Sequence, residues 1–418
     1  MVNTPLGTVI PRRAERAVSE ALSDTRVVLI NGARQSGKST LVRGIAKGVA
    51  AEWRDLDDPV ARQAAVSDPG GFVDFPQLMV VDEIQRVPEL LLAIKAQVDR
   101  DPRPGRYLLT GSSRLLGLRD LPDTLPGRME TIELWPFSQG EIDGTADGFV
   151  DAVFARGSEL RHTTGVTRAD YAARLVRGGF PEAVARPVAR RSQRFFDSYV
   201  GDLIARDIRQ LSEIERSGEM RALLRMLAAR SGQLLMVNGL SNELQLSAST
   251  VHRYLALLEE VFLVKRIPAW SRNVGNRAVA APKLAFVDSG IAANLLGADA
   301  GGLVRPGSAF GPLLEAFVLM ELGRQLTWAD ERVGLFHYRT KDKVEVDAVL
   351  ENRQGRVVGI EVKAASTVRA EDFRGLRHLA DRLGDDFVTG VVLYTGDQTY
   401  SFGDRMRAMP VSALWEVG

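Results

Sequence analysis

The chain of 418 residues contains no cysteine and only four histidines. The absence of cysteine excludes disulfides, zinc ribbons and thiol catalysis, and it is compatible with a reducing compartment. The histidines are scattered, so their spacing predicts no histidine metal cluster. Neither sign of charge dominates, because 54 basic residues face 53 acidic ones. No overall positive field therefore favours nucleic acid, and such a contact would need a local patch.

Long hydrophobic runs are also missing. Residues 1–16 lack the apolar core of a signal peptide, and no later run reaches membrane-spanning length. We therefore expect a cytoplasmic protein without membrane contact. A chain of this length with 45% hydrophobic and 26% charged residues is typical of a globular protein with two to four domains.

Lysine is scarce, since only eight of the basic residues are lysine. A chain rich in arginine can keep lysine for positions that need a compact ammonium group. Two of the eight, Lys38 and Lys363, take central places in the two motifs described below.

The order of the predicted elements indicates the α/β class. Apolar strands at residues 26–30, 77–81 and 106–110 alternate with predicted helices at 1–25 and 38–49. Such alternation favours a parallel sheet covered on both faces. Residues 167–230 are predicted to be helical, and mixed α/β character returns from about residue 290. There a helix at 313–326 precedes strands near 344–350, 357–362 and 391–394.

Residues 32–39, Gly-Ala-Arg-Gln-Ser-Gly-Lys-Ser, match the phosphate-loop pattern in full, between a predicted strand and a predicted helix. The glycines let backbone N–H groups turn toward phosphates at a helix N-terminus. Lys38 would reach the β- and γ-phosphates, and Ser39 would offer its hydroxyl to Mg²⁺. A glycine-rich turn that binds nothing is the alternative. We predict an ATP site made of Gly32, Ala33, Arg34, Gln35, Ser36, Gly37, Lys38, Ser39 and Thr40.

Two carboxylates end the second predicted strand, where ionised groups are costly unless they are paired or bound to metal. Asp82 would hold the magnesium and Glu83 would polarise the attacking water, which predicts ATP hydrolysis; a solvated strand end is the alternative. After the third strand, Ser112 is favoured over Thr110 and Ser113 as a sensor of the γ-phosphate.

An arginine in the stretch Pro126-Gly-Arg-Met is the last candidate of this part of the chain. Arg128 would supply a finger to a neighbouring subunit's phosphate, which requires a homo-oligomer. A surface arginine without a role in the site is the alternative.

The order of these motifs resembles a bacterial and archaeal family of AAA+ ATPases. The resemblance rests on the phosphate loop, Val-Asp-Glu-Ile-Gln (81–85), Leu-Leu-Thr-Gly-Ser-Ser (108–113), Gly-Arg (127–128) and Leu-Trp-Pro-Phe-Ser (134–138). Residues 283–290 are also similar to that family's Lys-x-x-Phe-x-Asp-x-Gly stretch. The resemblance spans nearly the whole chain and implies a C-terminal domain of unknown function similar to PD-(D/E)xK nucleases.

A second group of carboxylates and a lysine lies in the C-terminal part. Glu361 and Lys363 are two residues apart in a predicted strand, so they share a face, and Asp347 of the neighbouring strand can meet them. With Glu315 from the preceding helix, Asp347 and Glu361 would bind Mg²⁺ through hard oxygen ligands. Lys363 would orient a water or stabilise phosphate charge. The resemblance implies this arrangement as catalytic; the alternatives are an inactive relic of a nuclease fold and solvated residues of an edge strand.

Residues 240–260 have the pattern of two helices around a turn, followed by a strand as a wing would be. Early residues of the second helix are candidates for DNA contacts: Ser249, Thr250, His252 and Arg253. Glu259 and Glu260 are unfavourable beside phosphates, for which Arg266, Arg272 and Arg277 would compensate. An internal packing module is the alternative.

These features predict four domains: a P-loop AAA+ ATPase domain (1–160), a helical lid (161–230), a winged-helix-like segment (231–290) and a nuclease-like α/β domain (291–418). The main expectation is a Mg²⁺-dependent ATPase whose nucleotide state controls a DNA-binding or nuclease-like module acting on DNA or RNA. The alternatives are an ATPase switch with an inactive nuclease-like domain that binds a protein partner, and a nucleotide-gated DNA-binding regulator.

Overall fold

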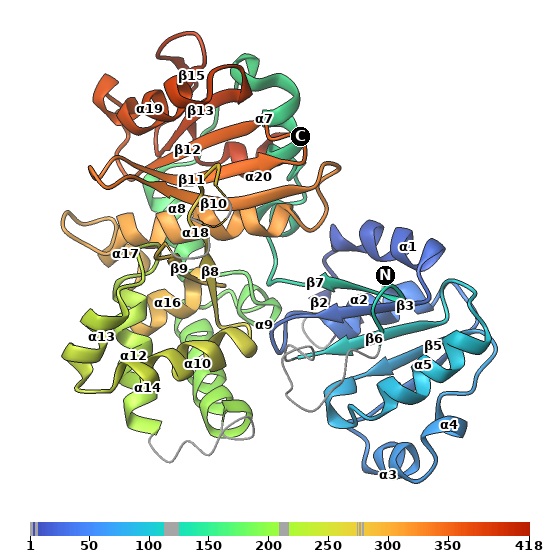
Figure 1. Ribbon diagram of the computed structural model, residues 1–418. Coiled ribbons are helices and arrows are strands. Elements are labelled where there is room, and N and C mark those ends of the chain that lie inside the picture. The colour runs from blue at the N-terminus through green and yellow to red at the C-terminus, as the bar shows by residue number, and fades with distance from the viewer. Residues whose placement is uncertain are drawn as a thin grey trace. The chain divides into compact units, whose positions relative to one another are not determined.

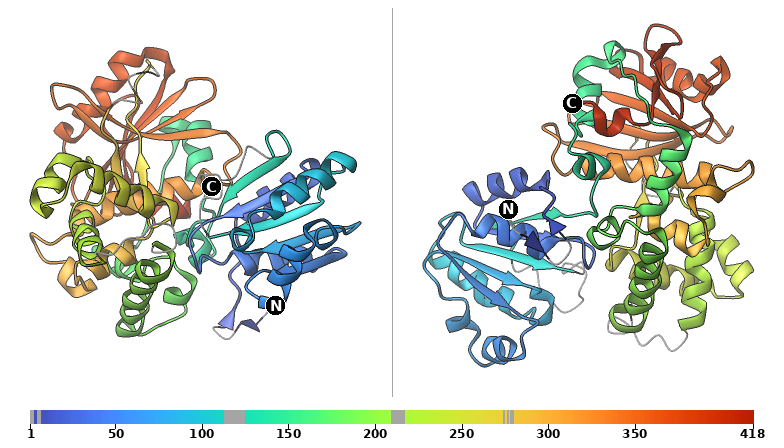
Figure 2. Two further views of the ribbon diagram at one scale, coloured as in Figure 1. Left: turned by 60° about the horizontal axis from the view of Figure 1, so that its bottom comes forward. Right: turned by 180° about the vertical axis from the view of Figure 1, so that it is seen from behind.

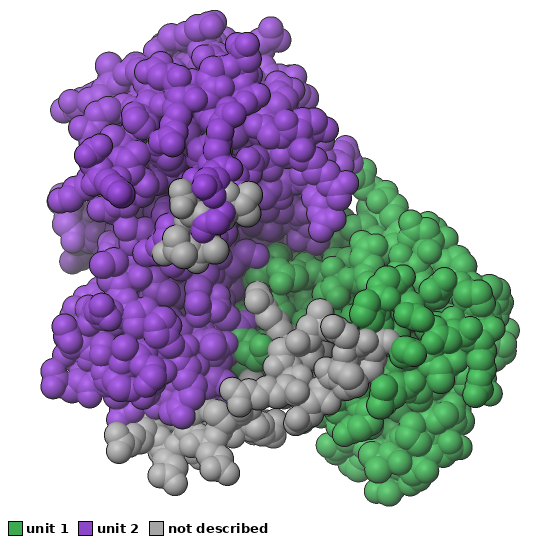
Figure 3. All heavy atoms as spheres, viewed as in Figure 1, with its two compact units in different colours: residues 1–137, 260–262 green, residues 138–259, 263–418 purple. Residues whose placement is uncertain are grey.

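A computed structural model describes residues 3–4, 7–112, 125–208, 217–273, 275, 277 and 280–418. The chain forms two compact units, residues 1–137 with 260–262 and residues 138–259 with 263–418 (Figures 1 and 3). The division falls after residue 137, whereas the predicted ATPase domain extends to residue 160. Residues 138–160 belong to the second unit because helix α7 (Phe149–Arg156) packs on the C-terminal helix α20 (Ala413–Glu416). The backbone N–H of Gly148 also donates to the carbonyl of Val417 over 2.8 Å.

The first unit is built on a five-stranded sheet with the order β4-β5-β6-β3-β7, in which all neighbours are parallel. The strands are β3 (Val27–Asn31), β4 (Ala51–Asp55), β5 (Leu78–Asp82), β6 (Tyr107–Gly111) and β7 (Met129–Glu133). In β3, Val27 and Leu29 join one core cluster, whereas Val28 and Ile30 join another. Both faces are thus buried, which explains the continuous apolar runs and confirms the predicted α/β class.

Helices cover both faces of this sheet (Figure 1). They are α1 (Ala14–Asp24), α2 (Lys38–Ala46), α3 (Pro59–Ser67), α4 (Pro69–Phe72) and α5 (Leu90–Arg100). The first helix begins later than the predicted helix over residues 1–25. It is preceded by a short hairpin of β1 (Asn3–Thr4) and β2 (Gly7–Thr8).

The first part of the second unit is mainly helical, as predicted for residues 167–230. Its elements are α6 (Gln139–Asp143), α7, η3 (Gly157–Glu159), α8 (Arg168–Arg177), α9 (Pro181–Val184), α10 (Ala189–Asp202), η4 (Leu203–Ile208) and α12 (Ser217–Ala229). The predicted pair of helices follows as α13 (Val237–Leu244) and α14 (Ala248–Glu260). Strands β8 (Val264–Ile267) and β9 (Lys283–Phe286) then pair antiparallel.

The C-terminal part holds a mixed six-stranded sheet with the order β10-β11-β12-β13-β15-β14 (Figure 2). The strands are β10 (Val333–Arg339), β11 (Glu345–Asn352), β12 (Val357–Lys363), β13 (Phe387–Tyr394), β14 (Tyr400–Ser401) and β15 (Met406–Pro410). The helices are α16 (Ser289–Leu295), α17 (Ala300–Leu303), α18 (Phe310–Gln325), η5 (Ala370–Phe373), α19 (Arg374–Leu383), η6 (Gly384–Asp386) and α20. Leu376 and Leu379 of α19 share a core cluster with Val357 of β12.

Helix α18 is buried along most of its length, including charged residues near its C-terminal end. Glu321 and Arg324 form an ion pair of 2.7 Å. Glu321 also accepts from the backbone N–H of Gln139 (2.9 Å), and Arg324 donates to the carbonyl of Val287 (2.8 Å). These bonds attach the first residues of the second unit to the helix that leads into the C-terminal sheet.

Within the described residues, no helix is long and apolar enough to cross a membrane.

Candidate functional site

The phosphate-loop residues lie where the sequence predicts them, between the end of β3 and the start of α2. Gly32 approaches the chain after β7 so closely that a Cβ atom would lie 2.2 Å from the carbonyl oxygen of Leu134. Gly37 has a φ of 98°, which L-residues with a side chain rarely adopt. Both glycines of the motif are therefore required by the local geometry.

Lys38 is buried beneath the loop, with 4% of its surface exposed. Its Nζ donates to the carbonyl oxygens of Gly32 and Ala33, each over 2.9 Å. Burial lowers the pKa of Lys38 to about 8, although the negative charges of Glu83 and Asp82 act in the opposite direction. The ammonium group thus sits inside the loop, where oxygens of a phosphate chain would be its natural partners.

Asp82 ends β5 beside the start of α2, as predicted. The hydroxyl of Ser39 donates to Asp82 Oδ1 over 3.1 Å, and the hydroxyl of Thr110 donates to the same oxygen. Burial raises the pKa of Asp82. A serine hydroxyl and an aspartate carboxylate in contact are hard oxygen donors of the kind that Mg²⁺ prefers, so these residues fit that ion.

Glu83 follows in a left-handed backbone conformation, with a φ of 60°. Its backbone N–H donates to Thr110 Oγ1 over 3.0 Å, and its Oε2 accepts from the hydroxyl of Ser112 over 3.0 Å. The side-chain amide of Gln85 donates to the same Oε2 and, over 2.7 Å, to Ser112 Oγ. The predicted base and the predicted sensor are thus in contact, whereas Ser113 lies outside the described residues.

Two positioning residues of this site, Gln85 and Arg12, were not predicted. Gln85 is the last residue of the Val-Asp-Glu-Ile-Gln motif, two residues after Glu83. Arg12 donates to the carbonyl of Ser36 in the phosphate loop (2.7 Å) and to that of Trp135 (2.6 Å). No local pattern marks Arg12, because its role depends on a contact more than 100 residues away along the chain.

Arg128 lies far from the phosphate loop of its own chain. It precedes β7, and its carbonyl accepts from the N–H of Val27 at the start of β3, whereas the loop follows the end of β3. A strand of five residues spans about 16 Å. The guanidinium is paired with Asp99 over 2.6 Å. Action of Arg128 on a neighbouring subunit stays a prediction, and a surface arginine without a role in the site stays the alternative.

The C-terminal carboxylates gather as predicted, but around a lysine that the prediction did not include. Lys283 Nζ lies 2.6 Å from Glu315 Oε1 and 2.8 Å from Asp347 Oδ1. Asp347 Oδ2 accepts from the N–H of Val362 over 2.9 Å, which joins β11 to β12. Ala348 pairs with Ile360, so Asp347 and Glu361 are the next opposed residues.

Glu361 and Lys363 share a face of β12, as their spacing predicts. Lys363 Nζ donates to Glu361 Oε1 over 3.0 Å and lies 3.8 Å from Asp372. The other oxygen of Glu361 is buried and has no hydrogen-bond partner among the residues that the structure describes. The predicted metal site at Glu315, Asp347 and Glu361 is not formed as such. Across the described part of the chain, no three His, Asp or Glu side chains lie together as metal ligands would.

Charge and burial shift the pKa values in this cluster. Burial and the neighbouring Asp347 raise the pKa of Glu315 to about 7 and that of Glu361 to about 8. Burial would lower the pKa of Lys283, but the charges of Asp347 and Glu315 outweigh it and hold the pKa above its usual range. The two carboxylates therefore favour the charged form of Lys283.

The stretch from Lys283 to Gly290 has further structural roles. Asp288 is fully buried, caps α16 by accepting from the N–H of Ile291 (3.2 Å), and accepts from that of Gly179 (2.6 Å). A Cβ on Gly290 would lie 2.5 Å from the ring of Phe196. Packing between the helices and the C-terminal sheet thus explains the pattern of lysine, phenylalanine, aspartate and glycine in residues 283–290.

The arginines expected to compensate the acidic end of α14 are all paired with carboxylates. Arg266 binds Glu259 over 2.8 Å, and the other two pairs are Arg272 with Asp386 and Arg277 with Glu351. Ser249, His252 and Arg253 are exposed on α14, so this surface of the helix is open to solvent. Arg266 thus compensates Glu259 at the end of α14, whereas Arg272 and Arg277 are paired with carboxylates elsewhere.

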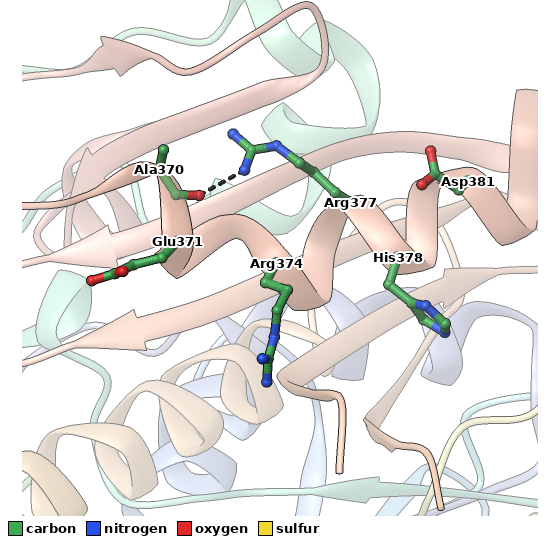
Figure 4. A pocket seen from close by; sticks show the side chains of 6 residues that line it. All are labelled: Ala370, Glu371, Arg374, Arg377, His378 and Asp381. Carbon is green, nitrogen blue, oxygen red and sulfur yellow. Dashed lines mark hydrogen bonds between the residues drawn. The ribbon is translucent and has the colours of Figure 1, made fainter. Parts of the chain in front are cut away.

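A shallow surface hollow of about 470 Å³ lies along α19 (Figure 4). It is lined by one stretch of chain: Ala370, Glu371, Arg374, Arg377, His378 and Asp381. Arg377 donates to the carbonyl of Ala370 over 2.6 Å, and His378 contacts Tyr338 Oη over 3.1 Å. The hollow contains none of the predicted site residues.

Three protein-family models match the chain. One described as "AAA domain" matches residues 24–143, one described as "Domain of unknown function (DUF8612)" matches 168–301, and one described as "Domain of unknown function (DUF4143)" matches 310–414. The geometry of the phosphate loop and the first match together make residues 24–143 an AAA-type P-loop ATPase domain. The other two descriptions assign no activity.

Relatives extend over most of the chain. An uncharacterized protein of Mycobacterium tuberculosis is 28% identical over 410 residues, which are 97% of this chain and 85% of that protein, and one of Mycobacterium bovis gives the same values. An uncharacterized protein of Haemophilus influenzae is 21% identical over 388 residues, 87% of this chain and 89% of its own. The similarity thus includes both units.

Solved structures are more distant. A Walker-type ATPase of Pyrococcus abyssi has a TM-score of 0.43 and 15% identity, with 69% of this chain and 96% of that chain covered. A variant of RuvB from Thermotoga maritima has a TM-score of 0.30 and 20% identity, covering 61% and 89%. At these scores the likeness supports no statement about substrate or partner.

Proposed function

We propose that this protein is a Mg²⁺-dependent ATP hydrolase. The observation that carries the proposal is the meeting of Lys38, Ser39 and Asp82 at the carboxyl edge of the parallel sheet, with Ser39 Oγ 3.1 Å from Asp82 Oδ1. Ligands of open α/β sheets bind at this edge, and the N-terminus of α2 adds a favourable dipole for phosphates.

Each residue of the site has a role that its position supports. Lys38 would bind the β- and γ-phosphates with a charge that burial makes costly in the absence of a ligand. Ser39 and Asp82 would hold Mg²⁺, which when bound supplies charge neutralisation at the phosphates. Glu83 would orient and polarise the attacking water, and Ser112 would hold the carboxylate of Glu83 in place.

We further propose that the nucleotide state acts on the second unit as a switch that binds a protein partner. The chain passes directly from β7 to Gln139, whose backbone N–H is bonded to Glu321 of α18. Arg266, Arg272 and Arg277 are neutralised by carboxylates, which weakens the case for a phosphate-binding surface beside α14. Two other functions compete with this proposal and are outcomes of the tests below. One is nucleic-acid cleavage through Asp347, Glu361 and Lys363, and the other is nucleotide-gated DNA binding through Arg253.

The decisive experiment measures ATP turnover by the full chain with Mg²⁺ and with EDTA. Lys38→Ala should abolish both binding and turnover, whereas Glu83→Gln should retain ATP and lower turnover by about 10²–10⁴-fold. Lys47→Ala is the matched control, because Lys47 is an exposed lysine at the other end of α2 and outside the predicted ATP site. A fluorescent ATP analogue measures binding separately from hydrolysis.

The same assay with mixed DNA and RNA separates the roles of the second unit. Turnover that nucleic acid does not change, without cleavage products on a gel, supports the protein-directed switch. Cleavage lost in Lys363→Ala, or retention of a duplex weakened by Arg253→Ala, would contradict it. No turnover in the wild type would overturn the hydrolase proposal itself.

A further inference from the structure

Lys283 is the central side chain of the C-terminal cluster. Its ammonium lies within 2.8 Å of carboxylate oxygens from two different elements, Glu315 of α18 and Asp347 of β11. Only 6% of its side chain is exposed, compared with 32% for Lys363 in the same cluster. A buried lysine needs such partners, because its charge is otherwise too costly to bury.

The position of Lys283 is fixed by the strand that carries it. Strand β9 pairs with β8 on one side, through Lys283 with Ile267. On the other side Lys283 forms a bridge with Leu234, and the N–H of Leu235 donates to the carbonyl of Pro282 over 2.8 Å. Strand β9 is thus paired along both edges, and this pairing fixes the ammonium group of Lys283 beside the carboxylates.

Carboxylates outnumber cations in this cluster. Glu315, Asp347, Glu361 and Asp372 lie within contact distance of two ammonium groups, those of Lys283 and Lys363. Without Lys283, Glu315 and Asp347 would lose the cation that both of them contact. One oxygen of Glu315 and one of Asp347 therefore converge on a position that favours a cation. The ammonium group of Lys283 occupies this position.

We propose that Lys283 is the built-in cation of the carboxylates Glu315 and Asp347 and occupies the position in which a divalent metal would bind. In this conformation the cluster binds β9 to α18 and β11 and takes no catalytic metal. Replacing Lys283 by an uncharged side chain of similar length opens a divalent-cation site. This inference does not depend on ATP hydrolysis by the first unit.

Titration of the full chain with Mn²⁺, followed by the electron paramagnetic resonance of the free ion, tests this proposal. All proteins carry Asp82→Asn, which removes the candidate magnesium ligand of the phosphate loop. The series is the Asp82→Asn protein alone, with Lys283→Met, and with Lys341→Met as a control at an exposed lysine. We expect one equivalent of bound Mn²⁺ for Lys283→Met and none for the other two.

Two further proteins decide the outcome. Adding Asp347→Asn to Lys283→Met should abolish the new site, and Mn²⁺ at about one hundred times its Kd should raise the Tm of Lys283→Met by roughly 5–10 °C. A folded Lys283→Met protein that binds no Mn²⁺ would overturn the proposal.

If Lys283→Met does not fold, the Asp82→Asn protein is compared with and without Asp347→Asn. Equal Mn²⁺ binding supports the proposal, and a site lost with Asp347 contradicts it. Because no nucleotide is present, failure here is distinct from failure of the hydrolase proposal.

Discussion

The buried ion pair of α18 should contribute strongly to the stability of the second unit. Glu321 is fully buried and Arg324 is 3% exposed, with 2.7 Å between them. Arg324→Met would leave the carboxylate of Glu321 buried without its cation, which costs about 3–5 kcal/mol of unfolding free energy. For a domain of this size class such a loss lowers Tm by roughly 6–20 °C.

The double variant separates the charge from the hydrogen bonds. Arg324→Met/Glu321→Leu removes both charges of the pair, but the N–H of Gln139 and the carbonyl of Val287 lose their partners. Arg324→Met alone already leaves the Val287 carbonyl without its partner, so the double variant exchanges an unpaired buried carboxylate for the unpaired N–H of Gln139, which costs about 1–3 kcal/mol. The double variant should therefore be less stable than the wild type and no less stable than Arg324→Met alone.

Hydrogen exchange with mass spectrometry and thermal unfolding of the full chain measure these changes. Faster exchange should appear in α18 and in residues 138–156, which the pair joins. Arg353→Met makes the same substitution at an exposed arginine and should stay within about 0.5 kcal/mol of the wild type. An Arg324→Met protein as stable as this control would refute the reasoning.

Three further predictions concern individual residues. Gly32→Ala places a Cβ 2.2 Å from a carbonyl oxygen, so ATP affinity should fall at least about tenfold in a fluorescent-nucleotide titration. Gly44→Ala is the control, because a Cβ there has nothing within 4 Å, and it should leave the ATP affinity unchanged. Gln85→Ala removes a partner of Glu83 and should lower kcat by roughly tenfold at unchanged ATP affinity; a raised Kd with normal kcat would contradict this role. Burial lowers the pKa of His337 to about 4, so below pH 6.5 the unfolded chain binds a proton that the native one does not. Stability should therefore fall by up to about 3 kcal/mol from pH 6.5 toward pH 4, and urea midpoints of His337→Phe should lack this fall.

The three inner strands of the first unit, β5, β6 and β3, were predictable because their signals are local, whereas the edge strands β4 and β7 were not predicted. Continuous apolar runs arise when both faces of a strand are buried, and the phosphate loop needs glycine, lysine and serine at fixed offsets. The C-terminal sheet was predicted only in part. β11, β12 and β13 were expected near their observed ranges, but β10, β15 and α19 were not. These elements are stabilised by strand pairing and packing that their own sequences do not indicate.

The sequence by itself determined the α/β class and the loop that surrounds Lys38, since both depend on neighbours along the chain. It also brought Glu361 and Lys363 to one face, because side chains two apart in a strand point the same way. Only the tertiary structure decided that Arg128 lies beyond the far end of β3, and that Lys283 stands between Glu315 and Asp347. Those outcomes depend on which strands pair and which helix covers them, and residues 32 and 64 positions apart meet only after the chain has folded.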